Sequence, residues 1–139
     1  MSYRSMRRAL AAIASFLSVA AIAPDAASQE APPFSSGKEF IAQTGQQLYQ
    51  TSCQGCHMAD GKGARGAGTY PALANNGNLQ VAEFIAIVVM HGKNGMPGFR
   101  EYMSDAQLAD VMNHVRSSFG NNYDTGITAD FVKKLSSHK

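Results

Sequence analysis

The amino-acid sequence predicts an all-α fold with three main helices, a short C-terminal helix and long connecting loops. Apolar residues recur at spacings of three and four along two segments, which is the period of an amphipathic helix. Serine or threonine residues precede three of the four expected helices, and no segment shows the alternation of apolar and polar residues that marks a strand. With 139 residues, 45% of them hydrophobic and 16% charged, the chain suits one compact domain.

The first main helix is predicted to begin after Thr44 and to run into Cys53. Thr44 and Gln47 have the spacing of a capping box, in which each side chain bonds a free backbone N–H of the first turn. Leu48 and Tyr49 lie on the apolar face that follows. This face predicts a short helix that packs against the core.

A glycine-rich loop is predicted over residues 58–77. Its five glycines are too many for a regular helix or strand, and a loop this long in a small domain is usually functional. These glycines are Gly61, Gly63, Gly66, Gly68 and Gly77.

The second main helix is predicted over residues 81–91 and is closed by Gly92 as a C-terminal cap. A further loop follows at residues 93–102, where Gly95, Pro97 and Gly98 interrupt regular structure. The apolar residues of the helix are Phe84, Ile85, Val88 and Val89.

The third main helix is predicted to be capped by Ser104, with Gln107 at the capping-box position, and to end at Gly120. Thr128 then begins a short last helix. The expected inward residues are Leu108, Val111, Met112, Val115 and Phe119 in the third helix and Phe131 and Leu135 in the last. So few helices make a sufficient core only if a large apolar ligand fills the centre.

Residues 1–28 have the order of a secretory signal peptide. Arg4, Arg7 and Arg8 precede an apolar stretch at 9–23, which is shorter than the roughly 20 residues of a membrane span. We therefore expect export to the periplasm, with no stable membrane span after cleavage, in preference to a retained anchor or a buried helix. The mature chain then has a flexible arm at residues 29–37, rich in proline and serine, and one domain at residues 38–139.

The formal net charge of +2 belongs to the signal segment. Removing residues 1–28 takes away three arginines and one aspartate from the 12 basic and 10 acidic residues, which leaves a net charge of zero. The chain has no dense basic run, so the sequence disfavours nucleic-acid binding. We expect a protein partner to dock on a local patch.

The only two cysteines, Cys53 and Cys56, form a CxxCH motif with His57, which is the attachment motif of c-type haem. Two thiols at this spacing can form thioethers with one porphyrin edge, and the adjacent imidazole can bind the iron. A thioredoxin-like redox pair expects a βαβ setting, which the sequence does not show. A zinc site would need four ligands, and His91, His114 and His138 lack a second paired spacing. The motif therefore favours a single covalent haem c.

With these residues in view, the chain resembles the class I c-type cytochromes over nearly all of its mature length. Gly45 and Tyr49 occupy the places where the family's first helix crosses its last, and His114 stands where the family often has an aromatic residue. The resemblance implies the cytochrome c fold, with the helices wrapped around one covalently attached haem. It also implies that the carbonyl of Pro71 accepts the proton of the proximal histidine and that Leu73 packs on the ring.

Met96 is the preferred sixth ligand of the iron. Gly95 and Pro97 hold its backbone in a rigid turn, and the family resemblance of this loop points to the same sulfur. Met103, just before the third helix, is the rival, whereas Met58 follows the proximal histidine too closely to reach the opposite face. His91 is a further alternative that would give a bis-histidine centre. Met90 and Met112 lie on helical stripes and are interpreted as core residues.

Ligation by His57 and Met96 leaves no open position on the iron, so we expect one-electron transfer rather than enzymatic chemistry. Apolar burial by Leu73, Phe84, Ile85 and Phe99 should raise the reduction potential. Expected partners are a periplasmic dehydrogenase as donor and a terminal oxidase or another cytochrome as acceptor. Two alternatives remain: a cytochrome subunit tightly bound in a dehydrogenase complex, and a haem enzyme or gas sensor with a labile methionine.

Overall fold

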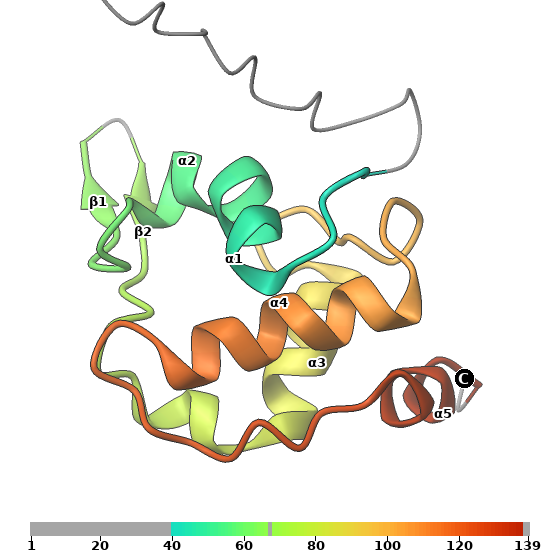
Figure 1. The fold of residues 1–139 in the computed structure, drawn as a ribbon. Helices are drawn as coiled ribbons and strands as arrows, with labels where there is room; N and C mark the ends of the chain where they lie inside the picture. The colour runs from blue at the N-terminus through green and yellow to red at the C-terminus, as the bar shows by residue number, and fades with distance from the viewer. Residues whose placement is uncertain (1–39, 67, 138–139) are drawn as a thin grey trace, which may run out of the picture. The chain divides into compact units, whose positions relative to one another are not determined.

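The structure, a computed structural model, describes residues 40–66 and 68–137, and it is mostly helical (Figure 1). This confirms the predicted fold class. The predicted signal peptide, the N-terminal arm and His138 lie outside the described residues. In chain order the elements are α1 (Gly45–Leu48), the π-helix η1 (Tyr49–Cys53), α2 (Gln54–His57), β1 (Ala64–Arg65), β2 (Thr69–Tyr70), the 3-10 helix η2 (Gly77–Gln80), α3 (Ala82–His91), α4 (Asp105–Ser117) and α5 (Ala129–Ser137).

The first helical stretch continues beyond its predicted end at Cys53. Thr44 caps it as expected, because its hydroxyl accepts a hydrogen bond from the backbone N–H of Gln47 at 3.2 Å. The predicted capping box is incomplete, because the Gln47 side chain accepts from the N–H of Gln43 and not from that of Thr44. From there α1, η1 and α2 follow one another without a gap as far as His57. The π-helical turn η1 has the wider i→i+5 hydrogen-bond spacing and ends at Cys53, the first residue of the cysteine motif. The amino-acid composition alone does not predict this turn.

The glycine-rich loop contains a short hairpin that the sequence analysis did not predict. β1 and β2 pair antiparallel, with Ala64 opposite Tyr70 and Arg65 opposite Thr69. Two residues per strand are too few to show an alternating pattern, which is why no strand was expected.

The second and third predicted helices are confirmed as α3 and α4. Gly92 caps α3 with a φ of 78°, and Ser104 and Gln107 form the complete capping box at the start of α4. However, α4 ends at Ser117, so the prediction that it extends to Gly120 was wrong. Phe119 has a φ of 59° and its ring packs 4.8 Å from that of Tyr49, outside the helical stripe to which it was assigned.

α1 lies directly against α4, and this crossing holds the cysteine motif on the core (Figure 1). A Cβ atom added at Gly45 would stand 2.1 Å from the carbonyl oxygen of Asp110 and 2.8 Å from the Cβ of His114. The ring of Tyr49 lies 5.6 Å from that of His114. The helix crossing that the family resemblance implies is therefore present, with an imidazole in the aromatic position.

The core is completed by α5, which packs on α4. Thr128 accepts a hydrogen bond from the N–H of Phe131 at 3.1 Å, so it begins this helix as predicted. Val132 is fully buried, whereas the predicted inward residues Phe131 and Leu135 are half-buried. Met90, Met103 and Met112 also lie in the buried core.

Candidate functional site

The cysteine motif occupies the last two turns of the first helical stretch. Cys53 ends η1 and is half-buried, Cys56 lies in α2 and is exposed, and both thiols are free. Helical residues three apart lie on one side of the helix, so both sulfur atoms can reach one edge of a flat ligand. Burial, and secondarily the charge of Cys56, raises the pKa of the Cys53 thiol to about 12.

The raised pKa of Cys53 argues against thioredoxin-like chemistry. A redox-active thiol needs a lowered pKa, because the thiolate is the attacking species. Over the described ranges 40–66 and 68–137, no group of three or more His, Cys, Asp or Glu side chains could hold a metal ion. A protein-only zinc site is therefore not formed by these residues.

His57 is oriented by a single hydrogen bond from its ring. The side chain is 7% exposed, and its Nδ1 lies 2.9 Å from the carbonyl oxygen of Pro71. Because a carbonyl can only accept, the proton is on Nδ1, and Nε2 keeps a lone pair for a metal. The hydrogen bond implied by the family resemblance is thus present in the structure.

Backbone contacts fix the loop that carries Pro71 against the motif. The N–H groups of Leu73 and Ala74 donate to the carbonyl of Gly61 at 2.7 and 2.9 Å, and the N–H of Gly63 donates to the carbonyl of His57 at 3.0 Å. Gly63 has a φ of 67°, and a Cβ there would stand 2.2 Å from the carbonyl oxygen of Tyr70. Glycine is therefore required for the loop to pass this close to β2.

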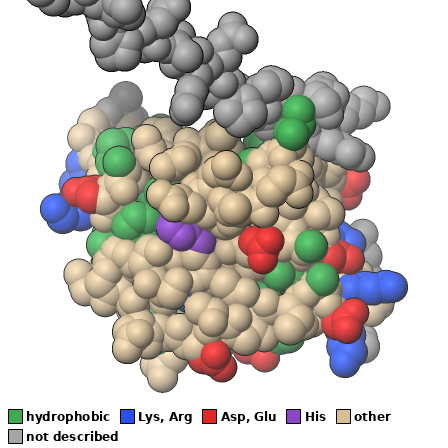
Figure 2. All heavy atoms as spheres, viewed as in Figure 1, with side chains coloured by type: hydrophobic (Ala, Val, Ile, Leu, Met, Phe, Trp, Pro, Cys, Tyr) green, Lys and Arg blue, Asp and Glu red, His purple; other side chains and the backbone are tan. Residues whose placement is uncertain are grey.

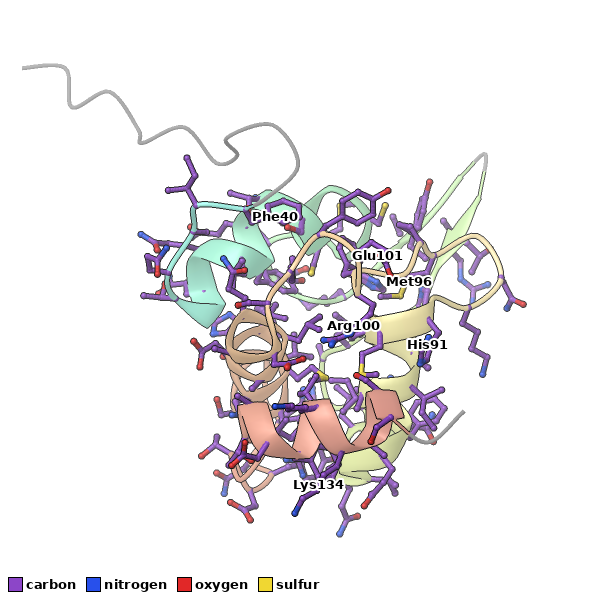
Figure 3. The ribbon with its side chains drawn as sticks, turned by 90° about the vertical axis from the view of Figure 1, so that its right-hand side faces the viewer. Phe40, His91, Met96, Arg100, Glu101 and Lys134 are labelled. Atoms are coloured by element: carbon purple, nitrogen blue, oxygen red, sulfur yellow. The ribbon has the colours of Figure 1, made fainter. Side chains whose placement is uncertain are left out.

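Met96 lies in the loop that follows α3, above the C-terminal end of that helix where His91 is labelled (Figure 3). Lys93 and Met96 exchange two backbone hydrogen bonds of 3.0 Å, and the N–H of Phe99 donates to the carbonyl of Val89 at 2.9 Å. These contacts hold the loop in a defined turn. Met96 is only half-buried, so its thioether remains available to a ligand.

The rival ligands have different surroundings. Met103 is 4% exposed and is part of the hydrophobic core. His91 is exposed at the last position of α3 and is followed by its cap. Met58 directly follows His57, with a φ of 66°, and its carbonyl accepts a hydrogen bond from the Tyr49 hydroxyl at 2.7 Å. Met96 therefore differs from Met103 in its exposure and from Met58 in its distance along the chain from His57.

Leu73, Val89 and Phe99 are, like Cys53, partly buried apolar residues that pack against the hydrophobic core. Phe84 departs from the prediction that it helps to bury the site, because it is 38% exposed. The Nζ of Lys93 lies 5.3 Å from the centre of its ring. Phe84 belongs to the solvent-facing side of α3, because the buried residues of that helix lie on its opposite side.

The donor set fits haem c. Two free thiols stand at attachment spacing, an imidazole has its proton turned away from the metal-binding nitrogen, and a thioether lies on a fixed turn. The partly buried apolar side chains of Leu73 and Phe99 are of the type that lines sites for flat aromatic ligands.

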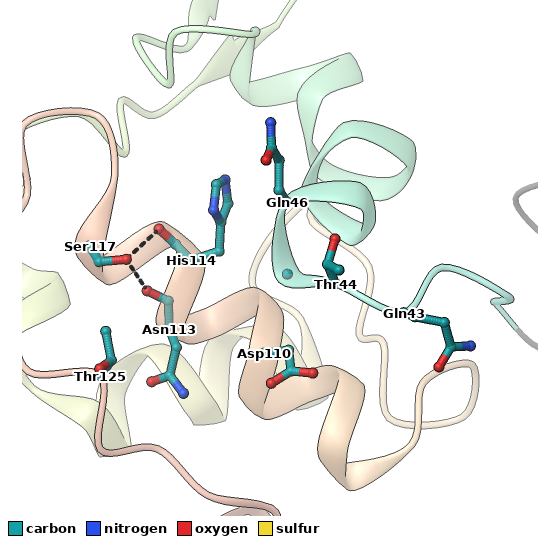
Figure 4. Close-up of a pocket in the computed structure, with 9 residues that line it drawn as sticks. Gln43, Thr44, Gln46, Asp110, Asn113, His114, Ser117 and Thr125 are labelled. Atoms are coloured by element: carbon teal, nitrogen blue, oxygen red, sulfur yellow. Dashed lines mark hydrogen bonds between the residues drawn. The ribbon is translucent and has the colours of Figure 1, made fainter. Parts of the chain in front are cut away.

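A separate polar groove of about 370 Å³ lies between the start of α1 and the second half of α4 (Figure 4). Asp110, His114 and Ser117 line it, and the Ser117 hydroxyl donates to backbone carbonyls of its own helix. The groove shares no residue with the cysteine motif or with Met96. On the face drawn in Figure 2, basic side chains lie at the left and right edges, and acidic side chains lie at both edges, near the middle and along the bottom.

The sequence analysis missed Asn121, which is buried behind the Pro71 loop. Its side chain bonds the backbone of Leu73 and of Asn76. In the sequence it stands in a Gly-Asn-Asn run after a helix, which signals only a turn.

The chain is similar to several known proteins. Residues 41–115 match the family model described as cytochrome C oxidase, cbb3-type, subunit III. The cytochrome c subunit of the quinone alcohol dehydrogenase of Gluconobacter oxydans is 33% identical over 104 residues, covering 66% of this chain and 21% of that subunit. Cytochrome c6 of Leptolyngbya boryana is 36% identical over 76 residues, covering 53% of this chain and 88% of that protein. The crystal structure of cytochrome c6 from the diatom Phaeodactylum tricornutum is 28% identical, with a TM-score of 0.46, and the match covers 54% of this chain and 90% of that one.

Proposed function

Because the chain belongs to the cytochrome c family, we propose that it carries single electrons on one haem c attached through Cys53 and Cys56, with His57 and Met96 as the axial ligands. The observation that carries the ligand assignment is the hydrogen bond from His57 Nδ1 to the Pro71 carbonyl. It fixes the tautomer in which Nε2 is free to bind iron.

The chain's own residues orient and shield the cofactor. Bound haem c supplies an iron that alternates between the ferrous and ferric states. Cys53 and Cys56 would hold the ring at α2 through thioethers, and the Pro71 carbonyl raises the basicity of His57. Leu73 and Phe99 reduce the access of water, which favours the less charged ferrous state.

A full set of two protein ligands supports electron transfer over catalysis at the metal. The alternative, a haem enzyme or gas sensor with a labile methionine, needs an open sixth position. The turn that holds Met96 is tied by two backbone hydrogen bonds to Lys93, which favours retained ligation. We expect the reduced protein at neutral pH not to bind carbon monoxide, and rapid binding would favour the alternative.

We further propose that the protein acts in the periplasm after cleavage of residues 1–28. The sequence order of this segment supports export. No helix within residues 40–66 and 68–137 is long and apolar enough to cross a membrane. In this proposal the mature chain carries one cytochrome domain, over the predicted range 38–139.

The similarity to the alcohol dehydrogenase cytochrome subunit supports a periplasmic dehydrogenase as electron donor, with a terminal oxidase or another cytochrome as acceptor. This chain spans 21% of that subunit's length. A free carrier and a bound subunit are separated by purification under native conditions. A dehydrogenase that co-purifies in stoichiometric amounts identifies a subunit, and a monodisperse single chain identifies a carrier.

The axial ligand is tested with a matched pair of methionine variants. Both Met96→Ala and Met103→Ala remove a thioether, but Met103 is packed in the core. We expect Met96→Ala to lose the low-spin spectrum and to lower the potential, while Met103→Ala keeps the spectrum and loses stability by about 2–5 kcal/mol. A low-spin Met96→Ala protein together with a high-spin Met103→Ala protein would reassign the ligand.

A further inference from the structure

We propose that Asn121 is a positioning residue for the electron-transfer site: it sets the strength of the hydrogen bond between His57 and Pro71, and through it the reduction potential. This inference rests on the proposed function, because it takes His57 as the proximal ligand. It assigns a role to a residue more than sixty positions beyond the cysteine motif.

The Asn121 side chain uses all of its hydrogen-bonding groups to tie two segments together. It is 6% exposed. Its Nδ2 donates to the carbonyl of Leu73 at 2.8 Å and to the carbonyl of Val115 at 2.9 Å, while its Oδ1 accepts from the N–H of Asn76 at 3.0 Å. Val115 belongs to α4, so the amide fastens the Pro71 loop to the end of that helix.

The two residues before Asn121 strengthen the same attachment. The carbonyl of Phe119 accepts from the N–H of Asn75 at 3.2 Å, and a Cβ at Gly120 would stand 2.4 Å from the Asn75 side-chain oxygen. Gly120 has a φ of 82°, which glycine adopts without strain. Figure 1 shows the turn after α4 beside the segment that descends from β2.

The Pro71 loop is therefore held from two sides. On the motif side, Gly61 accepts from the N–H of Leu73. On the other side, Asn121 binds the Leu73 carbonyl, two residues after the carbonyl that accepts from His57. A buried amide with every group paired has little freedom to move, so the Pro71 oxygen is held at hydrogen-bonding distance from Nδ1.

The expected effect on the potential follows from the chemistry of the imidazole. A well-held acceptor draws the Nδ1 proton and makes Nε2 a stronger electron donor, which stabilises the ferric state. Loosening the acceptor weakens this donation. The potential should therefore rise when Asn121 is replaced by a residue that cannot bind the Leu73 carbonyl.

The test compares Asn121→Ala with Asn113→Ala in the haem-loaded protein. Asn113 is a matched control, because it is a residue of α4 whose side chain binds a later segment through two hydrogen bonds. It donates to the Ile127 carbonyl at 2.8 Å and accepts from the Ile127 N–H at 3.2 Å. Neither of these hydrogen bonds involves the Pro71 loop. Two quantities are measured: the midpoint potential, and the solvent-exchange rate of the His57 ring proton in the ferrous protein by NMR.

We expect Asn121→Ala to raise the potential and to speed exchange of the ring proton about tenfold, a factor that corresponds to about 1.4 kcal/mol, the size of one hydrogen bond. Asn113→Ala should lower stability but leave both quantities at their wild-type values. Asn121→Ser should give a smaller change in the same direction, because its hydroxyl can replace only part of the hydrogen bonding of the amide. This variant tests the inference if Asn121→Ala does not fold and bind haem.

An unchanged potential and exchange rate in the Asn121 variants would overturn the inference, as would equal changes in the Asn113 control. The proposed function fails separately, if the wild-type protein carries no covalent haem or shows no reversible one-electron couple.

Discussion

The crossing of α1 over α4 gives the sharpest test of how the motif is positioned. In Gly45→Ala the new Cβ would lie 2.1 Å from the carbonyl oxygen of Asp110 and 2.7 Å from its carbon, so the clash is with backbone and no side chain can rotate to relieve it. To reach the 3.4 Å of ordinary contact, α1 must move away from α4 by about 1.3 Å. The strain costs about 1–3 kcal/mol. Alanine's better helix propensity returns at most about 1 kcal/mol.

Gly77→Ala is the matched control for this variant. Gly77 is also the first residue of a short helical element, η2, but a Cβ there meets nothing within 4 Å. We expect Gly77→Ala to leave stability unchanged or to raise it by up to about 1 kcal/mol, and Gly45→Ala to lower it by about 1–2 kcal/mol. Guanidinium unfolding of the haem-loaded proteins measures both. Equal midpoints for the two variants would refute the close crossing of α1 and α4.

Three further predictions concern buried polar groups. Tyr49→Phe removes the donor to the Met58 carbonyl at 2.7 Å and should cost about 1–3 kcal/mol in the free energy of unfolding; no change in urea unfolding would contradict the contact. Burial lowers the pKa of the His114 imidazole below 6.5, so the unfolded chain takes up a proton at His114 more readily than the folded chain. The free energy of unfolding should therefore fall as the pH drops below about 6.5, and His114→Phe should remove this contribution to the dependence of stability on pH. The buried Arg116 guanidinium donates to the carbonyls of Leu79, Gln80 and Asp124, so Arg116→Ala should lower the free energy of unfolding by about 3 kcal/mol or more. Arg100→Ala breaks only the half-exposed ion pair with Asp105 and should lower it by less than about 1 kcal/mol. Similar thermal midpoints for the two variants would contradict this difference.

The sequence was sufficient to predict those features that depend only on neighbouring residues. Ser104 and Gln107 predict the start of α4, and Gly92 predicts the end of α3, because a cap depends on neighbouring residues alone. The CxxCH motif and the Pro71 segment were also identified in the sequence, and the structure brings His57 and Pro71 together.

Features that depend on contacts between distant segments could not be predicted from the sequence. The end of α4 at Ser117 is set by the turn through Phe119, whose ring packs on Tyr49 seventy positions earlier. The hydrogen bonds of Asn121 to Leu73 and Asn76 join segments more than forty residues apart. Phe84 has the helical spacing of an inward residue, but it lies on the solvent-facing side of α3, because tertiary packing decides which side of the helix is buried.

Covalent attachment of one haem at Cys53 and Cys56 is the central claim, and it is tested most directly by intact mass spectrometry of the mature chain together with a pyridine haemochrome spectrum. We predict the mass of the polypeptide plus one haem, and a haemochrome with both vinyl groups converted to thioethers. Cys53→Ala with Cys56→Ala should give the bare polypeptide mass. An unmodified mass for the wild-type chain produced in an exporting host with haem-attachment machinery would contradict the account.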